Sequence, residues 1–134
     1  MKTLLIAVII SFSFPAVAQV AEKAVPTSKT TFSLGGCGIT NRHTEKYEEL
    51  MKIVSEKNVQ ELFKWLRSDD LGIQLYALEG YKRLAVDIDD ATRALISTIL
   101  DSKSEVLSCA GCFVSYQSVE SIVRQNDYLE LLKK

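Results

Sequence analysis

The sequence has few of the residues that build catalytic centres. Of its 134 residues, one is histidine, His43, and three are cysteine. A single histidine excludes the paired-histidine metal motifs of hydrolases, and no Gly-x-Ser-x-Gly elbow supplies an activated serine. The glycine-rich run at residues 35–38 lacks the lysine of a phosphate-binding loop, and Phe113 replaces the histidine that covalent haem attachment requires after Cys112. The sequence therefore predicts no cofactor and favours a non-enzymatic role.

An excess of charge of one sign is also lacking. The chain has 16 basic and 17 acidic side chains, and basic residues such as Lys82 and Arg83 are interspersed with acidic ones. Nucleic-acid-binding domains gather lysine and arginine into a patch or stripe. We therefore expect no nucleic-acid partner.

A long uninterrupted apolar run is missing as well. Residues 4–14 are mostly apolar, follow Lys2, and lead into the small residues of positions 15–18. This order is typical of a secretory signal peptide, and we expect cleavage after Ala18. The alternative, a retained helical anchor, would need about 18 or more apolar residues. The sequence thus predicts a secreted or periplasmic protein that does not insert into the membrane after signal cleavage.

The segment after the expected signal peptide, residues 19–40, has two parts. Residues 19–31 are polar, contain Pro26, and offer little apolar surface for burial, which predicts a flexible lead. Residues 32–40 contain three glycines around Cys37, a composition that lets irregular backbone approach another element closely. The remaining residues, 41–134, suffice for one compact domain.

Residues 41–134 show helical periodicity, and strand signals are scarce. One apolar face predicts a first helix over residues 42–57, and Asn58 with Glu61 has the form of a capping box that starts a second. Polar caps predict further helix starts at positions 68–70, 89–90, 104 and 118. On the second helix Trp65 is expected to be buried between helices. The sequence predicts an all-α fold of short antiparallel helical hairpins, arranged as a solenoid or an orthogonal bundle.

The sequence of residues 62–84, LFKWLRSDDLGIQLYALEGYKRL, resembles a HEAT-type repeat. In such repeats an apolar helix ends in a turn containing aspartate, and a second helix continues with an aliphatic residue and an Ala-Leu pair, which Asp70, Ile73, Ala77 and Leu78 match. A second unit overlays the first with the same apolar spacing and reaches Val106 and Ala110. The resemblance implies a small right-handed stack of helices that binds a partner through an exposed helical surface. It implies no catalytic residues.

The three cysteines allow three arrangements. Cys109 and Cys112 are three residues apart, so on a helix starting near Ser104 they would share one face, as in a redox dithiol. Cys37, Cys109 and Cys112 with His43 could instead form a zinc site. In an oxidising compartment we favour a disulfide from Cys37 to Cys109 or Cys112, because it closes the longer loop, and we expect the remaining thiol to be buried and inert.

The sequence therefore predicts an exported, non-enzymatic binding or interaction module whose partner is a protein. The alternative is a thiol-disulfide oxidoreductase or thiol-metal protein that uses the Cys109–Cys112 pair. The partner-binding residues, the pairing of the cysteines and the oligomeric state are left open by the sequence.

Overall fold

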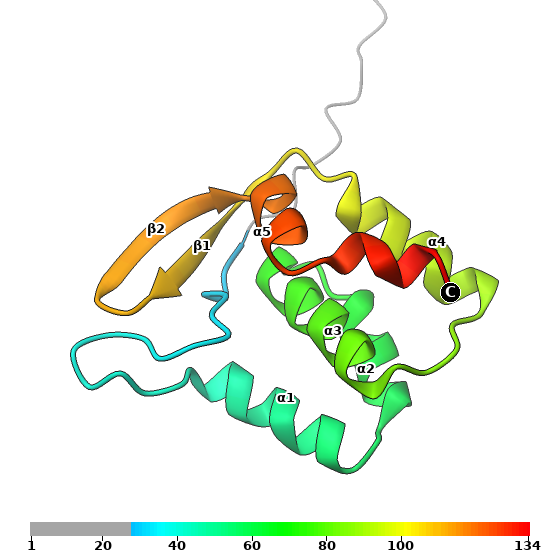
Figure 1. Cartoon of the computed structure of the whole chain (residues 1–134), viewed down its shortest axis with the longest axis horizontal. Helices are drawn as coiled ribbons and strands as arrows, with labels where there is room; N and C mark the ends of the chain where they lie inside the picture. The colour runs from blue at the N-terminus through cyan, green and yellow to red at the C-terminus, as the bar shows by residue number, and fades with distance from the viewer. Residues whose placement is uncertain (1–27) are drawn as a thin grey trace, which may run out of the picture.

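The computed structural model describes residues 28–134, and the predicted signal peptide lies outside them. The described chain runs through four helices, a β-hairpin, a fifth helix and a short 3-10 helix (Figure 1). The elements are α1 (Glu45–Ser55), α2 (Val59–Leu66), α3 (Leu71–Leu84), α4 (Asp90–Leu100), β1 (Glu105–Ala110), β2 (Phe113–Ser118), α5 (Val119–Gln125) and η1 (Tyr128–Leu132). None of these helices is long and apolar enough to cross a membrane.

The helices begin where polar side chains cap them. Asn58 accepts a hydrogen bond from the Glu61 backbone, and Asp70 caps α3 in the same way. Asp89 caps α4 and Ser118 caps α5, so these predicted starts are confirmed. The capping box at Asn58 is only half formed, because the Glu61 carboxylate accepts from the Trp65 indole instead. Each cap satisfies amides that the first helical turn leaves without a partner.

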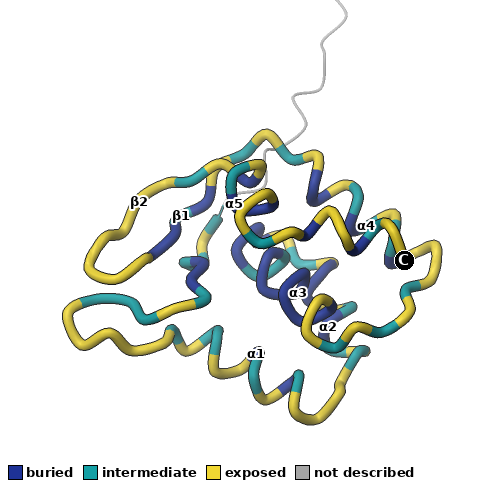
Figure 2. The backbone as a smooth tube through the Cα atoms, in the orientation of Figure 1, coloured by how far each residue is buried: buried dark blue, intermediate teal, exposed yellow. Residues whose placement is uncertain are grey.

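Helix α3 forms the centre of the core, as Figure 2 shows by its burial. Its buried side chains include Leu75, Ala77 and Leu78, and it packs against α1, α2, α4 and η1. Gly80 lets α1 and α2 come close, because a Cβ there would lie 2.5 Å from a methyl group of Leu62. Trp65 is buried as predicted.

A hydrogen-bonded cluster lies between α3 and η1 at the edge of this core. The buried Glu79 carboxylate accepts from the Tyr128 hydroxyl at 2.8 Å and pairs with Arg83 at 2.7 Å. Burial and the adjacent negative charge raise the pKa of Tyr128, so the phenol stays protonated and donates. Glu79 is thus buried with its charge paired and hydrogen-bonded.

The prediction of an all-α fold is wrong, because residues 105–118 form an antiparallel hairpin. The helix expected from Ser104 is strand β1, in which Val106, Ser108 and Cys109 are buried and the two end residues are exposed. Gly111 and Cys112 form the two-residue connection, and Gly111 has φ +59°, which matches a turn with glycine at its first central position. The second HEAT-like unit is therefore not a helical hairpin, since Val106 and Ala110 lie in β1.

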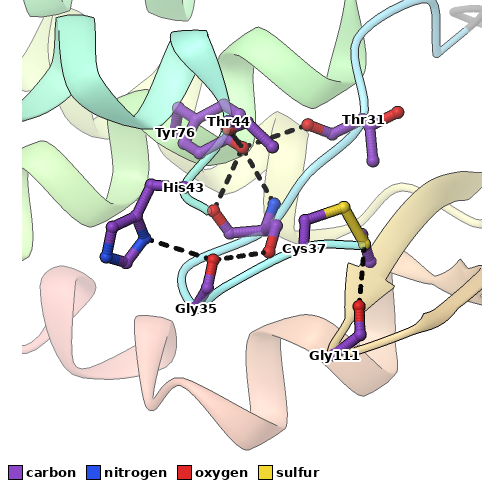
Figure 3. The surroundings of a disulfide bond; sticks show 9 residues. Thr31, Gly35, Cys37, His43, Thr44, Tyr76 and Gly111 are labelled. Atoms are coloured by element: carbon purple, nitrogen blue, oxygen red, sulfur yellow. Dashed lines mark hydrogen bonds between the residues drawn. A yellow bond between two sulfur atoms is a disulfide. The ribbon is translucent and has the colours of Figure 1, made fainter. Parts of the chain in front are cut away.

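The segment before α1 packs along the other side of β1. The Phe32 amide donates to the Leu107 carbonyl at 2.8 Å, and the Cys109 amide donates to the Phe32 carbonyl at 3.1 Å. The Tyr76 hydroxyl accepts from the Ser33 amide at 2.9 Å and lies 2.8 Å from the Thr44 hydroxyl (Figure 3). Burial raises the pKa of Tyr76, which keeps this hydroxyl available as a donor. The segment is thereby fixed between α3 and the sheet.

Candidate binding groove and hairpin

A disulfide joins the glycine-rich segment to the hairpin. Cys37 is bonded to Cys109 with their Cα atoms 5.6 Å apart, one of the two pairings that the sequence analysis favoured (Figure 3). Backbone bonds support the same contact: the Gly38 amide donates to the Gly111 carbonyl at 2.7 Å, and the Gly111 amide donates to the Gly36 carbonyl at 3.1 Å. The glycine-rich segment therefore lies alongside β1 as an irregular neighbour of the hairpin. Disulfides of this kind are typical of oxidising compartments.

The third cysteine differs from its prediction. Cys112 is free and exposed in the hairpin turn, so the expectation of a buried remaining thiol is wrong. Cys109 and Cys112 do not share a helix face, because one lies in β1 and the other in the turn. The sulfur of Cys109 is bonded to Cys37, so the Cys109–Cys112 pair is not joined.

The structure does not bring together the four residues of the hypothetical zinc site, and Cys112 is free in the hairpin turn. Two of its sulfurs, from Cys37 and Cys109, are in the disulfide. His43 is exposed, stacks on the Tyr47 ring with centroids 4.4 Å apart, and has Nδ1 at 3.2 Å from the Gly35 carbonyl. Within residues 28–134 no three side chains of the ligand-forming types are grouped to hold a metal ion.

A groove of about 350 Å³ lies where the glycine-rich segment, the hairpin and α5 meet. Its lining comes from residues 32–36 with Asn41, from residues 108–111 with Gln117, and from Ile122, Gln125 and Asn126. No residue of this lining is charged. The groove therefore suits a ligand without net charge, because a charged group would lose its hydration without gaining an opposite charge.

Three carboxamides of the groove keep hydrogen-bonding capacity for a ligand. Gln117 accepts from the Ser108 hydroxyl at 2.7 Å with its oxygen, which leaves its amide N–H groups as donors. Gln125 donates to Ser121 and Asn126 donates to the Ile122 carbonyl, which leaves their side-chain oxygens as acceptors. Donors and acceptors of this kind match the N–H and C=O groups of a peptide.

Large apolar side chains are exposed on both faces of the hairpin. The exposed fractions are 80% for Phe113, 69% for Tyr116 and 56% for Val114, and β2 is exposed along most of its length in Figure 2. In the register of the hairpin Phe113 pairs with Ala110, so it lies on the same sheet face as the groove residues Ser108 and Gln117. Phe113 is not itself part of the groove lining, but its cross-strand partner Ala110 is.

Val114 and Tyr116 lie on the opposite face of the hairpin, because successive strand residues alternate. Ile39 is 95% exposed in the loop between Cys37 and Arg42, which contacts the hairpin turn through Gly38. Neither these residues nor the carboxamides of the groove were predicted from the sequence as functional. The run Phe113, Val114, Ser115, Tyr116 has the β-branched and aromatic content of a strand, and this signal could have indicated them.

Comparison of the chain with protein-family models, with curated proteins and with solved structures finds no match. The resemblance of residues 62–84 to a HEAT-type repeat stays a prediction. The fold and the site define a small disulfide-linked domain of helices with a β-hairpin.

Proposed function

We propose that the protein is an exported, non-enzymatic binding module that holds an uncharged stretch of a protein partner in the groove. The observation that carries this proposal is a groove lined without charge, with carboxamides at its wall and the exposed Phe113 paired across the hairpin with the lining residue Ala110. Exposed aromatic side chains next to hydrogen-bonding groups are typical of peptide-binding surfaces. The disulfide and the backbone bonds of Gly111 hold two walls of the groove in place, which lowers the entropy lost on binding.

Site-specific photo-crosslinking in the cells that produce the protein tests this proposal. A photoreactive amino acid at position 125 is expected to capture a defined partner protein, and Phe113→Ala should reduce the yield. The matched control places the same group at position 129, where Leu129 is also exposed but lies outside the groove. Equal capture at both positions, or no capture at 125, would overturn the proposal.

The same experiment separates the binding module from the thiol-based alternative. Cys112 is exposed in the turn beside the disulfide, so Cys112→Ser removes the free thiol without disturbing the groove lining. A binding module keeps its crosslinks in this variant. Loss of the crosslinks in Cys112→Ser, together with their retention in Phe113→Ala, would favour the thiol-based alternative.

A further inference from the structure

The outer edge of β2 has backbone groups that point away from the protein. Ala110 and Phe113 close the two-residue turn as a hydrogen-bonded pair, so the next pair, Cys109 with Val114, is a non-hydrogen-bonded one. The same alternation makes Leu107 with Tyr116 a non-hydrogen-bonded pair. The backbone N–H and C=O groups of such pairs face outward from the two strands.

The two edges of the hairpin differ in how these outward groups are used. On the β1 edge they bond to Phe32, which donates to the Leu107 carbonyl and accepts from the Cys109 amide. On the β2 edge the corresponding groups belong to Val114 and Tyr116, and no backbone group within residues 28–134 bonds to them. Figure 1 shows β2 at the outer margin of the molecule, with β1 on its inner side. The edge of β2 is therefore open for pairing.

Strand β2 also lacks the features that keep an edge strand from pairing. Its sequence, FVSYQS, contains no charged residue and no proline. Native edge strands are commonly protected by lysine, proline, a bulge or a covering segment. Here Val114 and Tyr116 stand exposed at the positions whose backbone groups are open. Such an edge favours a further strand that adds hydrogen bonds and covers these side chains.

We propose that a second copy of this chain pairs with β2, antiparallel and about a two-fold axis at Ser115. In this register Ser115 faces the Ser115 of the second copy, and Val114 faces the second copy's Tyr116 on both sides of the axis. The outward groups of Val114 and Tyr116 then exchange hydrogen bonds as hydrogen-bonded pairs. The side-chain pairs are β-branched with aromatic, a favourable cross-strand combination.

The strand is suited to pairing with itself because a two-fold axis brings identical segments together. A charged residue in β2 would meet charges of its own sign close to the axis, and none is present. The axis stands perpendicular to the sheet, so a continuous four-stranded sheet results with both grooves on the same face. The dimer would thereby present two binding sites side by side. This inference does not depend on the groove's having the function proposed above.

Sedimentation equilibrium of the mature chain carrying Cys112→Ser, which prevents an incidental disulfide between copies, tests the proposal. The parent is expected to have the mass of a dimer. V114K/Y116K places like charges opposite each other twice and should raise the dissociation constant by about 30-fold or more. V114K/Y116E places opposite charges at the same points and should restore the dimer.

The control for folding is far-UV circular dichroism, whose spectrum both variants should retain because the two side chains are exposed. A monomeric parent would overturn the proposal, even if the edge of β2 binds a strand of another protein. Equal dissociation constants for the two double variants would overturn it as well, since the charge pairing would then be irrelevant to assembly.

The free thiol of Cys112 provides an independent measurement. In the proposed register Cys112 lies opposite the Ser118 of the second copy, and the span from position 112 to 118 is about 20 Å at roughly 3.4 Å per residue. A spin label on Cys112 should therefore give a dipolar distance near this value, broadened by the label. The distance should vanish in V114K/Y116K. Its absence in the parent, or its persistence in that variant, contradicts the proposed interface.

Discussion

Removal of the disulfide is the most direct test of how the hairpin is attached to the helices. The change is C37A/C109A in a chain that also carries Cys112→Ser, so that no other sulfur can pair. The bond joins residues 72 positions apart. On the chain-entropy model, closing a loop of this length in the unfolded chain contributes about 4 kcal/mol. We expect the free energy of unfolding to fall by about this amount.

The native structure should survive the loss of the bond, because other contacts hold the same segments together. Phe32 is buried and exchanges two backbone hydrogen bonds with β1. Gly111 bonds to Gly36 and Gly38 on either side of Cys37. The effect should therefore appear in the unfolded state, with the circular dichroism of the folded protein unchanged.

Equilibrium unfolding in urea provides the measurement. At an m-value of about 2 kcal/mol/M, the midpoint should fall by roughly 2 M. Cys112→Ser alone is the control, and its reduction by dithiothreitol should reproduce the shift of C37A/C109A. A loss below about 1 kcal/mol would refute the entropic reasoning. Loss of cooperative unfolding would refute the claim that backbone bonds suffice to hold the hairpin.

Three further predictions concern the helical body. Leu78→Ala should destabilise by about 2–5 kcal/mol in thermal or urea melts, because the side chain is fully buried in α3, and an unchanged melt would contradict the core assignment. Asp70→Ala should lower the free energy of unfolding by about 1–3 kcal/mol, because this buried carboxylate caps α3 and accepts hydrogen bonds from Thr30. Deleting the residues before Phe32 should destabilise the Asp70→Ala variant little further, because the bonds between Asp70 and Thr30 are already lost. Side-chain and backbone hydrogen bonds from Thr92 hold the pKa of Asp89 below its ordinary value. The stability that ionised Asp89 contributes is therefore present above about pH 4 and is lost as the pH falls through the lowered pKa. Asp89→Asn should remove this part of the acid dependence of unfolding, as measured by urea melts at several pH values.

The helix starts could be predicted because their signals are local. Asn58, Asp70, Asp89 and Ser118 each lie within three residues of the amide that they cap. A cap depends on few neighbours, so its pattern in the sequence carries most of the information. In α2 the buried Leu62, Trp65 and Leu66 recur at helical spacing, whereas α3 is buried on all sides from Leu75 to Tyr81, which its central position and not its periodicity explains.

The hairpin could not be predicted in this way, because its residues also fit a helical pattern. Val106, Ala110 and Phe113 recur at helical spacing, and Ser104 precedes them as a cap would. What decides for a strand is a contact distant in sequence, since Phe32 bonds to both Leu107 and Cys109 and continues the sheet. The groove was missed for a related reason, because its lining comes from residues 32–41 and 108–126, which are far apart in the sequence.

The register of the hairpin explains a choice that the sequence left open, namely which cysteine bonds to Cys37. Cys109 belongs to a non-hydrogen-bonded pair of β1, so its backbone faces the segment that contains Phe32 and Cys37. Its side chain is buried there, within reach of Cys37. Cys112 lies beyond the end of β1, in a turn whose other residue, Gly111, makes the backbone contacts to the glycine-rich segment. A one-residue slip of β1 would turn Cys109 to the other face of the sheet and break the match, so the disulfide and the strand pairing require each other.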